Sequence, residues 1–559
     1  MRPATRTANT VLTFTVAALL GGCLGHPVKE VVYDKVDIVR EPLRLDLNRD
    51  VDILFVIDNS GSMAEEQARL ARNFPAFIAA LDGMRADYRI GVTTTDVAHP
   101  GCSSGATPED GALVLRSCLD AVAQGAFVFN DLDAAYACTE QCKLGPDELR
   151  QQPSVYDGEL HPWLESIGGQ ANLAPGVAMA DAFACFGPQG IDGCGYESPL
   201  EAMRLAITKA RGPEGNGFMR DEALLSVVLV TDEADCSSNP AHKDIFTTNT
   251  TFQNDVAPQR TSATCWRAGT ACSGAGPDFK ECHAEDYSAD GSPGADDDAV
   301  LHPVDRYIDF LAGLRGLSGE PTGQPAGDGG PAARDVLVSL ITGVPVGYDR
   351  GEAEIEYHAA EPGSEQAINF GIAPGCTNSE DGSNSTAIPP VREREVAEAF
   401  AGEDGARNLF SICQDDYSPA LEQIARSIEK ALAPACAGAC VADSDPETEL
   451  LEPDCLVTAE LPDASEVEVP ACVRAGDGWA VPADADACFY TLVDPGGRSD
   501  FKGDDMTLVP GPDGQAIAAC GQDGENLEFK ILREGPRRPG IHYSAECVVA
   551  QGPESCHVG

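Results

Sequence analysis

The chain has 559 residues, of which 43% are hydrophobic, so it is long and apolar enough to form more than one folded domain. Its 90 acidic and 38 basic residues give a formal net charge of −52. Because binding to nucleic acid requires clustered Lys and Arg, this charge excludes DNA and RNA as partners and disfavours adsorption to anionic lipid.

Residues 1–22 are expected to be a signal peptide, because arginines precede an apolar core that is too short to span a membrane. The ending LGGC resembles the lipobox of bacterial lipoproteins, in which the cysteine is lipidated and becomes the first mature residue. This resemblance implies an acyl anchor on Cys23 that holds the protein to a lipid bilayer, with residues 23–49 as a tether. Leu24 in place of Asp favours the outer membrane, on its periplasmic or surface face. A plain signal peptide with a nearby cysteine is the alternative.

The remaining cysteines support export. Twelve lie from Cys102 to Cys413 and eight from Cys436 to Cys556, so each region has an even number and can close its own disulfides. Natural candidates are the near pairs Cys138/Cys142, Cys185/Cys194 and Cys436/Cys440. Zinc is the alternative for the cysteines of CAGAC (436–440) and ECH (281–283).

Strands and helices alternate between residues 50 and 434, which predicts an α/β fold with a doubly wound, mostly parallel sheet. Strands are predicted at 53–57, 87–96, 225–230, 335–344 and 409–413, and helices at 63–84, 197–210, 303–314 and 418–434. Disulfide-rich insertions are expected near 98–190, 236–302 and 346–407, with candidate edge strands at 111–115 and 125–129. Residues 435–559 are expected to form a small Cys-rich β domain.

Oxygen-bearing side chains follow two of the predicted core strands. Asp58, Ser60 and Ser62 occupy alternate positions in DNSGS after the first strand, and Asp232 ends the strand LVTD. Ligands of such sheets bind at the carboxyl ends of the strands, so these residues should face one crevice. A set of carboxylates and hydroxyls favours Mg²⁺, Mn²⁺ or Ca²⁺ over zinc or copper. The sequence therefore predicts a site for a divalent cation.

These motifs resemble the metal-ion-dependent adhesion site (MIDAS) of the von Willebrand factor type A (VWA) family, which has a Rossmann-like fold. The family combines Asp-x-Ser-x-Ser after the first strand, a Thr before a central helix and an Asp after a later strand. DNSGS and VLVTDE fit the first and last elements, and GYESPLEA offers Ser198 in place of the Thr, with Glu197 as a candidate further ligand. The pattern is also similar to VWA-containing lipoproteins of myxobacterial type.

The resemblance implies that the hydroxyls of Ser60, Ser62 and Ser198 bind the ion directly. Asp58 and Asp232 would bind it directly or through water. One coordination position stays open in the family, and an acidic side chain of a protein or other macromolecular partner fills it. Ser198 also begins SPLE, a helix-capping pattern, so a cap and a ligand remain alternatives at that position.

Four other polar residues are expected to lie beside the ligands of the ion rather than on the ion. They are Thr95, Asp96, Glu233 and Asp235.

An enzyme is not expected. GCSSG (101–105) matches Gly-x-Ser-x-Gly, but no strand leads into it and no helix follows, as a nucleophile elbow requires. The expected function is a lipid-anchored envelope or surface protein that binds a macromolecule through a divalent cation. The alternative is an envelope scaffold that uses the same fold without a functional metal site.

Overall fold

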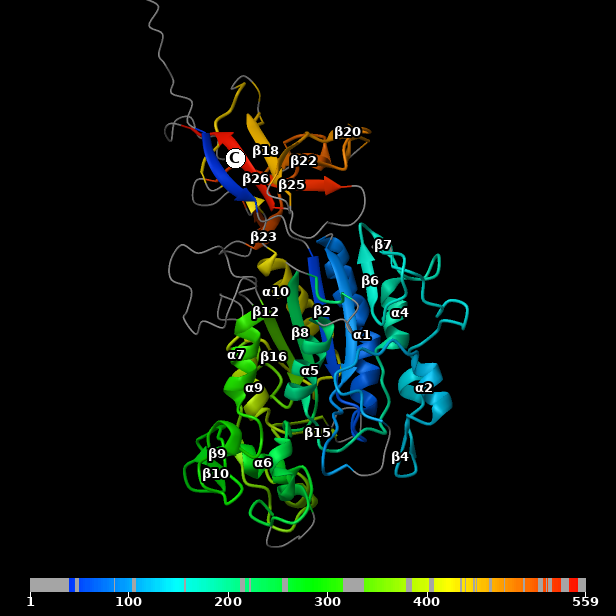
Figure 1. Ribbon diagram of the computed structural model, residues 1–559, viewed down its shortest axis with the longest axis vertical. Helices are drawn as coiled ribbons and strands as arrows, with labels where there is room; N and C mark the ends of the chain where they lie inside the picture. The colour runs from blue at the N-terminus through cyan, green and yellow to red at the C-terminus, as the bar shows by residue number, and fades with distance from the viewer. Residues whose placement is uncertain are drawn as a thin grey trace, which may run out of the picture. The chain divides into compact units, whose positions relative to one another are not determined.

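The computed structural model describes residues 40–45 and 50–550 (Figure 1). The gaps are residues 85, 103–106, 155–156, 212–216, 221–222, 254–259, 315–335, 379–384, 402–406 and several short stretches between 433 and 541. The expected signal peptide, Cys23 and Ser103 of GCSSG lie outside the described residues. Among the described helices, none is long and apolar enough to cross a membrane.

The largest sheet has seven strands in the order β16-β12-β8-β2-β3-β6-β7. Their bounds are β2 Asp50–Ile57, β3 Asp87–Thr94, β6 Leu164–Ile167, β7 Gln170–Ala171, β8 Leu224–Val230, β12 Val336–Thr342 and β16 Leu409–Ser411. The pairs from β16 to β3 are parallel, whereas β6 and β7 run antiparallel at one edge. The predicted mostly parallel sheet is confirmed.

Helices cover both faces of this sheet, as predicted for a doubly wound fold (Figure 1). Helices α1 (Ala64–Gly83), α4 (Met179–Phe186) and α10 (Ser418–Ala431) pack on one face, and α5 (Pro199–Arg211), α7 (Val304–Leu314) and α9 (Val391–Glu398) on the other. On β2, Ile53 and Phe55 face the first group, while Leu54 and Val56 face the second. Both sides of the strand are buried, which explains its unbroken apolar run.

Two expectations for the segments between the core elements are wrong. Residues 111–115 form no strand, and within 125–129 only Val128–Phe129 is a strand, β4, which pairs with β5 (Leu132–Asp133) in a separate hairpin. Strands β6 and β7 extend the sheet beyond β3 instead, with β7 as the edge strand. Short apolar runs do not by themselves distinguish an edge strand from a loop, which is why the sequence misled.

Helix α9 lies inside the stretch that was expected to be an insertion, yet it packs on β12 and α7 as part of the sheet's cover. Most of its residues are charged, so no apolar stripe marks it in the sequence. The shorter elements outside the core are α2 Cys118–Gln124, α3 Tyr136–Thr139, η2 Pro240–Phe246, α6 Ala263–Gly269, β9 Thr270–Ser273, β10 Asp278–Phe279, β11 Glu281–Ala284, η3 Asp296–Asp298, β13 Tyr357–His358, α8 Glu365–Asn369, β14 Cys376–Asn378 and β15 Ser385–Ala387.

The C-terminal part is built from small antiparallel sheets, as expected. Strands β1 (Arg40–Leu45), β26 (His542–Val548), β18 (Cys455–Glu460) and β19 (Glu466–Val469) form one sheet, and β17 (Ala435–Cys436), β25 (Glu528–Arg533) and β22 (Ala487–Leu492) form another. The pairs β20–β21 (Val473–Ala475, Gly478–Ala480) and β23–β24 (Leu508–Pro510, Ala516–Ala518) and the short helix η4 (Lys502–Asp504) complete it. Residues 40–45, within the expected tether, thus pair with the C-terminal strand β26.

Disulfides close within each cysteine region, as predicted. The pairs are Cys102–Cys194, Cys118–Cys138, Cys142–Cys185, Cys236–Cys265, Cys272–Cys282, Cys376–Cys413, Cys436–Cys520, Cys455–Cys547 and Cys472–Cys488, and Cys440 is also disulfide-bonded. All three near pairs proposed from spacing are wrong, because packing brings more distant cysteines together. Zinc is excluded for Cys282, Cys436 and Cys440, since their sulfurs are in disulfides. So many disulfides are typical of an exported protein.

Candidate metal centre

The carboxyl ends of the central strands meet at one level of the sheet. In the parallel register, Ile57 of β2 pairs with Thr94 of β3 and with Val230 of β8. The backbone pairing continues one step further, because the amide of Asp58 donates to the carbonyl of Val230 at 2.9 Å. Residues that leave these strands therefore start side by side, although they are far apart in the sequence.

Four of the predicted ligands form one connected group. The Ser60 amide donates to Oδ1 of Asp58 at 2.7 Å, and the hydroxyls of Ser60 and Ser62 lie 3.1 Å apart. The Ser62 hydroxyl donates to Oδ1 of Asp232 at 3.1 Å. Asp58, Ser60 and Asp232 are buried, whereas Ser62 is exposed, so the group is reached from solvent at Ser62.

Thr231 and Gln67 hold this group in place, and sequence reasoning did not identify either. The Thr231 hydroxyl donates to Oδ2 of Asp58 at 2.6 Å. The Gln67 side-chain amide donates to the carbonyls of Asp58 and Gly190, at 2.8 and 2.7 Å. Thr231 lies directly before Asp232 in the motif, so its position gave a usable signal. Gln67 sits on α1 among residues of ordinary helical spacing, and nothing in the sequence marks it.

Two further carboxylates join Asp58 and Asp232. Glu197 accepts a hydrogen bond from the Thr95 hydroxyl through Oε2, and its other oxygen, Oε1, is buried without a hydrogen-bond partner among the described residues. Glu233 accepts a hydrogen bond of 2.7 Å from the Ser262 hydroxyl. None of the four carboxylate side chains is more than 8% exposed, and none takes part in an ion pair found in the described part of the chain.

The four acids repel one another. Burial raises the pKa of Asp232 and of Glu197 well above the usual values, and the negative charge of Asp58 raises both further. Burial also raises the pKa of Asp58, and it raises the pKa of Glu233 to about 8, again with the charge of Asp58 adding to the effect. Ionised carboxylates at this depth are costly without a compensating cation.

The donor set fits a hard divalent cation. It consists of carboxylate and hydroxyl oxygens, which suit Mg²⁺, Mn²⁺ or Ca²⁺. A bound cation would offset the repulsion between the carboxylates, and the unpartnered Oε1 of Glu197 is a buried acceptor available to it or to a water bound to it. Asp58, Ser60, Ser62, Glu197 and Asp232 are the residues that would hold the ion.

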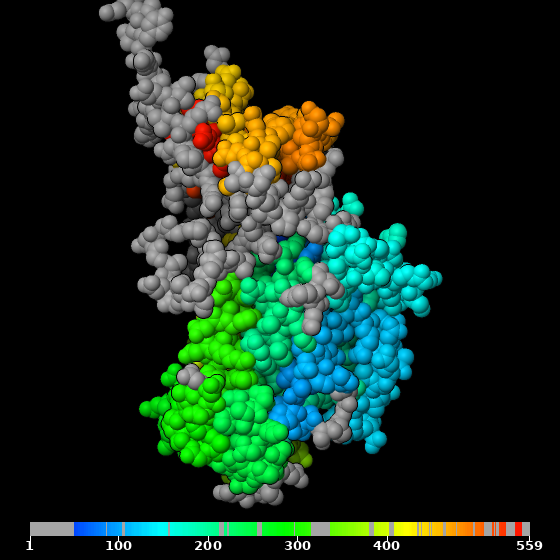
Figure 2. Space-filling view, in the orientation of Figure 1, coloured from blue at the N-terminus to red at the C-terminus, as the bar shows by residue number. Residues whose placement is uncertain are grey.

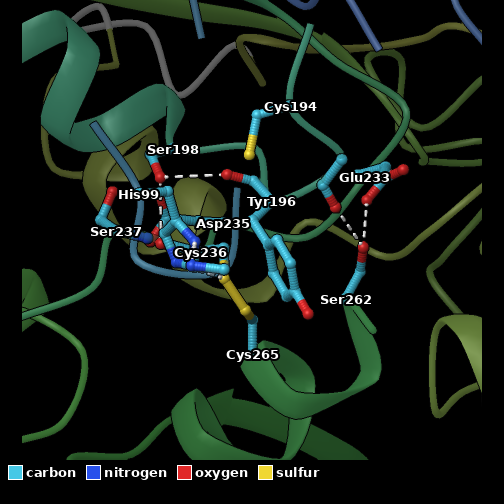
Figure 3. The surroundings of a disulfide bond; sticks show 12 residues. His99, Cys194, Tyr196, Ser198, Glu233, Asp235, Cys236, Ser237, Ser262 and Cys265 are labelled. Carbon is cyan, nitrogen blue, oxygen red and sulfur yellow. Dashed lines mark hydrogen bonds between the residues drawn. A yellow bond between two sulfur atoms is a disulfide. The ribbon is translucent and has the colours of Figure 1, made fainter. Parts of the chain in front are cut away.

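Ser198 lies next to this group but its hydroxyl points elsewhere. It donates to the carbonyl of Cys236 at 3.0 Å, as Figure 3 shows. Its hydroxyl does not cap α5 either, because the Glu201 amide donates to the Ser237 hydroxyl at 2.9 Å. Asp235 is likewise engaged in another contact, a buried ion pair of 3.0 Å with Arg392. Asp96 is buried nearby, and burial together with the charge of Glu109 raises its pKa to about 7.

A disulfide fastens the segment that follows β8. Cys236 is joined to Cys265 of α6, and Ser262, just before α6, donates to Glu233 (Figure 3). The Cys236 amide also donates to the carbonyl of Glu197 at 2.6 Å. Residues 232–236 are thus attached both to Glu197, just before α5, and to α6. The cysteine count predicted disulfides in this region, but spacing could not assign this pair.

No protein-family profile and no curated protein matches this chain. Among solved structures, it is weakly similar to pilus adhesins. SpaC from Lactobacillus rhamnosus GG is 10% identical over 90% of this chain and 40% of its own, with a TM-score of 0.24. GBS104 from Group B Streptococcus agalactiae is 9% identical over 92% of this chain and 81% of its own (TM-score 0.24), and RrgA from Streptococcus pneumoniae is 9% identical over 92% and 58% (TM-score 0.21). The chain spans well under half the length of SpaC.

Proposed function

We propose that this chain is a VWA-type adhesion protein of the cell envelope that binds a macromolecular partner through a divalent cation. The ion is held by Asp58, Ser60, Ser62, Glu197 and Asp232. An acidic side chain of the partner completes its coordination. The protein is exported and anchored in the outer membrane through acylated Cys23.

One observation carries the proposal. Four buried carboxylates, with hydroxyl donors between them, gather where neighbouring parallel strands end, and they have no basic partner among the described residues. Such a cluster disfavours the empty folded state, and a divalent cation is the ligand that relieves it. Ser62 is an exposed residue, so one side of the group is open to a partner.

Metal binding is tested by thermal melting of the mature chain, solubilised in mild detergent, with EDTA or with Mg²⁺, Mn²⁺ or Ca²⁺. An ion present at about 100 times its Kd stabilises the folded state by about 2.7 kcal/mol, which corresponds to a rise in Tm of roughly 3 °C for a folded unit of this length. In EDTA, Asp232→Asn should melt at a higher temperature than the wild type, because it removes one of the mutually repelling charges. It should not respond to the ions.

The control is Asp309→Asn, an exposed acid on α7. This variant should keep the full response to the ion. A wild-type chain whose Tm is the same in EDTA and in every ion would end the proposal of a metal site.

The scaffold alternative is favoured by one observation, the hydroxyl of Ser198, which bonds to the Cys236 carbonyl instead of facing the cluster. Capture of partners from native envelopes separates the two functions. Metal-bridged adhesion requires partners that EDTA releases and that Asp232→Asn fails to capture. A scaffold keeps the same partners under both conditions.

The lipid anchor is supported by the LGGC ending and by the many disulfides of an exported chain. Labelling of growing cells with radioactive palmitate should mark the wild type and leave Cys23→Ser unlabelled. Cys23→Ser should also leave the membrane fraction.

A further inference from the structure

Exposed apolar side chains gather in one hairpin of this protein. Among the described residues, half of the large hydrophobic side chains that are exposed lie within nine residues of one another: Val128, Phe129, Leu132 and Tyr136. Scattered single exposed apolar residues are ordinary on protein surfaces, but a local group of them indicates an interaction site.

The hairpin is a built structure. Strands β4 and β5 pair across a two-residue turn, Asn130–Asp131, in which both residues have positive φ, of 47° and 69°. This is the turn geometry that matches the twist of paired strands, and Asn and Asp tolerate it better than other side chains. The Cys118–Cys138 disulfide closes the segment that contains the hairpin. The exposed apolar residues are therefore held in fixed positions.

One face of the hairpin lies against the candidate metal centre. Phe129 and Leu132 are directly opposite each other in the register, so their side chains are on the same side. A Cβ added at Gly61 would collide with the Phe129 ring, so this ring rests on the backbone between Ser60 and Ser62. At the base, Ala134 is buried against Ala64 and Ile191. In the space-filling view the light-blue segment that contains β4 is at the surface (Figure 2).

Phe129 and Leu132 are 40% and 50% exposed although they adjoin Ser62, the open side of the cluster. We propose that this Phe129–Leu132 pair is a docking surface that selects protein partners in which the acidic side chain is flanked by an apolar side chain. The inference rests on the proposed metal-bridged function. A carboxylate that reached an ion at Ser60 and Ser62 would bring its neighbours in the partner's chain against the Phe129 ring.

Charge and area favour this occupant over two others. Asp131 and Asp133 of the same hairpin are exposed, and their charges disfavour insertion into a membrane with anionic lipids. A few side chains of one hairpin also offer far less than the roughly 1,200 Å² that a stable interface between two copies of the chain buries. The surface suits a short segment that is already held at a neighbouring contact.

The test uses a phage-displayed library of random heptapeptides, captured by the full mature chain in MgCl₂ and released by EDTA. Selected peptides should contain Asp or Glu next to Leu, Ile, Met or Phe. Phe129→Ser/Leu132→Ser should bind the selected peptide about tenfold to a hundredfold more weakly, from the apolar area lost. Leu160→Ser, which removes an apolar side chain that is 60% exposed, is the matched control and should bind it as the wild type does.

Parallel melting curves separate this inference from the function on which it rests. The double variant should keep the wild-type rise of Tm in Mg²⁺, because it leaves every proposed ligand intact. The wild-type Tm could rise in Mg²⁺ while the selection yields no peptide, or yields peptides whose acid has no apolar neighbour. Either result overturns the docking surface alone. No Mg²⁺ response in the wild type overturns both. Two other outcomes would also overturn the inference. Self-association in EDTA, seen by sedimentation of the wild type and lost in the double variant, would assign the hairpin to a second copy of the chain. Liposome binding in EDTA that is lost in the double variant would assign it to lipid.

Discussion

The hydroxyl of Ser62 donates a 3.1 Å hydrogen bond to the carboxylate of Asp232, a residue 170 positions further along the chain. This bond joins the loop after β2 to the segment after β8. Together with the bond from Thr231 to Asp58, it places neutral donors between acids that would otherwise face one another unshielded. Ser62 is exposed and Asp232 is buried, so mutation can separate an effect on metal binding from an effect on stability.

Ser62→Ala should weaken Mg²⁺ binding about tenfold while changing the free energy of unfolding in EDTA by less than about 0.5 kcal/mol. The side chain is exposed, so its loss costs little stability, but it removes one oxygen from the proposed ligand set. Titration of Tm with MgCl₂ measures both quantities. Ser427→Ala, whose hydroxyl donates within α10, is the control and should alter neither.

Ser198→Ala should lower stability by about 1 kcal/mol and leave Mg²⁺ affinity unchanged. The substitution leaves the buried carbonyl of Cys236 without the hydroxyl that donates to it, and the proposed ligands remain. Urea unfolding in EDTA and MgCl₂ titration measure the two effects. A tenfold loss of affinity at unchanged stability would instead assign Ser198 to the ion, as the VWA resemblance implies.

Replacing Cys236 and Cys265 together by Ser should lower stability by about 3 kcal/mol, because the disulfide closes a loop across 29 positions. It should also reduce the Mg²⁺-induced rise in Tm, since residues 232–236 lose one attachment. The matched control replaces Cys272 and Cys282 together by Ser. The disulfide between these two cysteines closes a loop across only 10 positions. That variant should lose less stability and keep the Mg²⁺ response. Equal Mg²⁺ responses in both variants would contradict the expected bracing role.

Stability in EDTA should fall as pH rises from about 4.3 to 8, in part through Glu393. Burial raises the pKa of this carboxyl to about 8, and the charge of Asp235 adds to the rise, whereas an unfolded Glu has a pKa of about 4.3. Between these values the folded state binds a proton that the unfolded state has released, so the free energy of unfolding decreases with pH. Glu393→Gln should reduce this slope, measured by urea unfolding at several pH values.

The control for that slope is Glu398→Gln, on the same helix, whose side chain is half exposed. It should leave the pH dependence unchanged. A Glu393→Gln variant with the wild-type slope would show that the buried carboxyl does not titrate in this range.

The sheet was predictable because its strands are buried on both faces. Ile53–Ile57 and Leu225–Val230 are unbroken apolar runs, and such runs between amphipathic helices admit few alternatives to a parallel sheet. The grouping of Asp58, Ser60, Ser62 and Asp232 followed from the rule that parallel strands end at one edge. What the group binds remains a prediction.

Other features depend on packing that a single sequence does not encode locally. The direction of the Ser198 hydroxyl depends on the carbonyl of Cys236, which comes from another segment. The disulfide partners of Cys138 and Cys142 depend on how α2, α3 and α4 pack together. Phe129 is an ordinary residue of an apolar run until the fold lays it on Gly61.

The pairing of β1 with β26 means that the seven-stranded part and the C-terminal β sheets are joined by two passages of chain rather than one. The first leads from Leu45 of β1 to Asp50 of β2, and the second follows α10. Six residue pairs hold β1 to β26, and the Cys455–Cys547 disulfide fastens β26 to β18. A single proteolytic nick after α10 would therefore leave the severed C-terminal fragment attached through backbone hydrogen bonds.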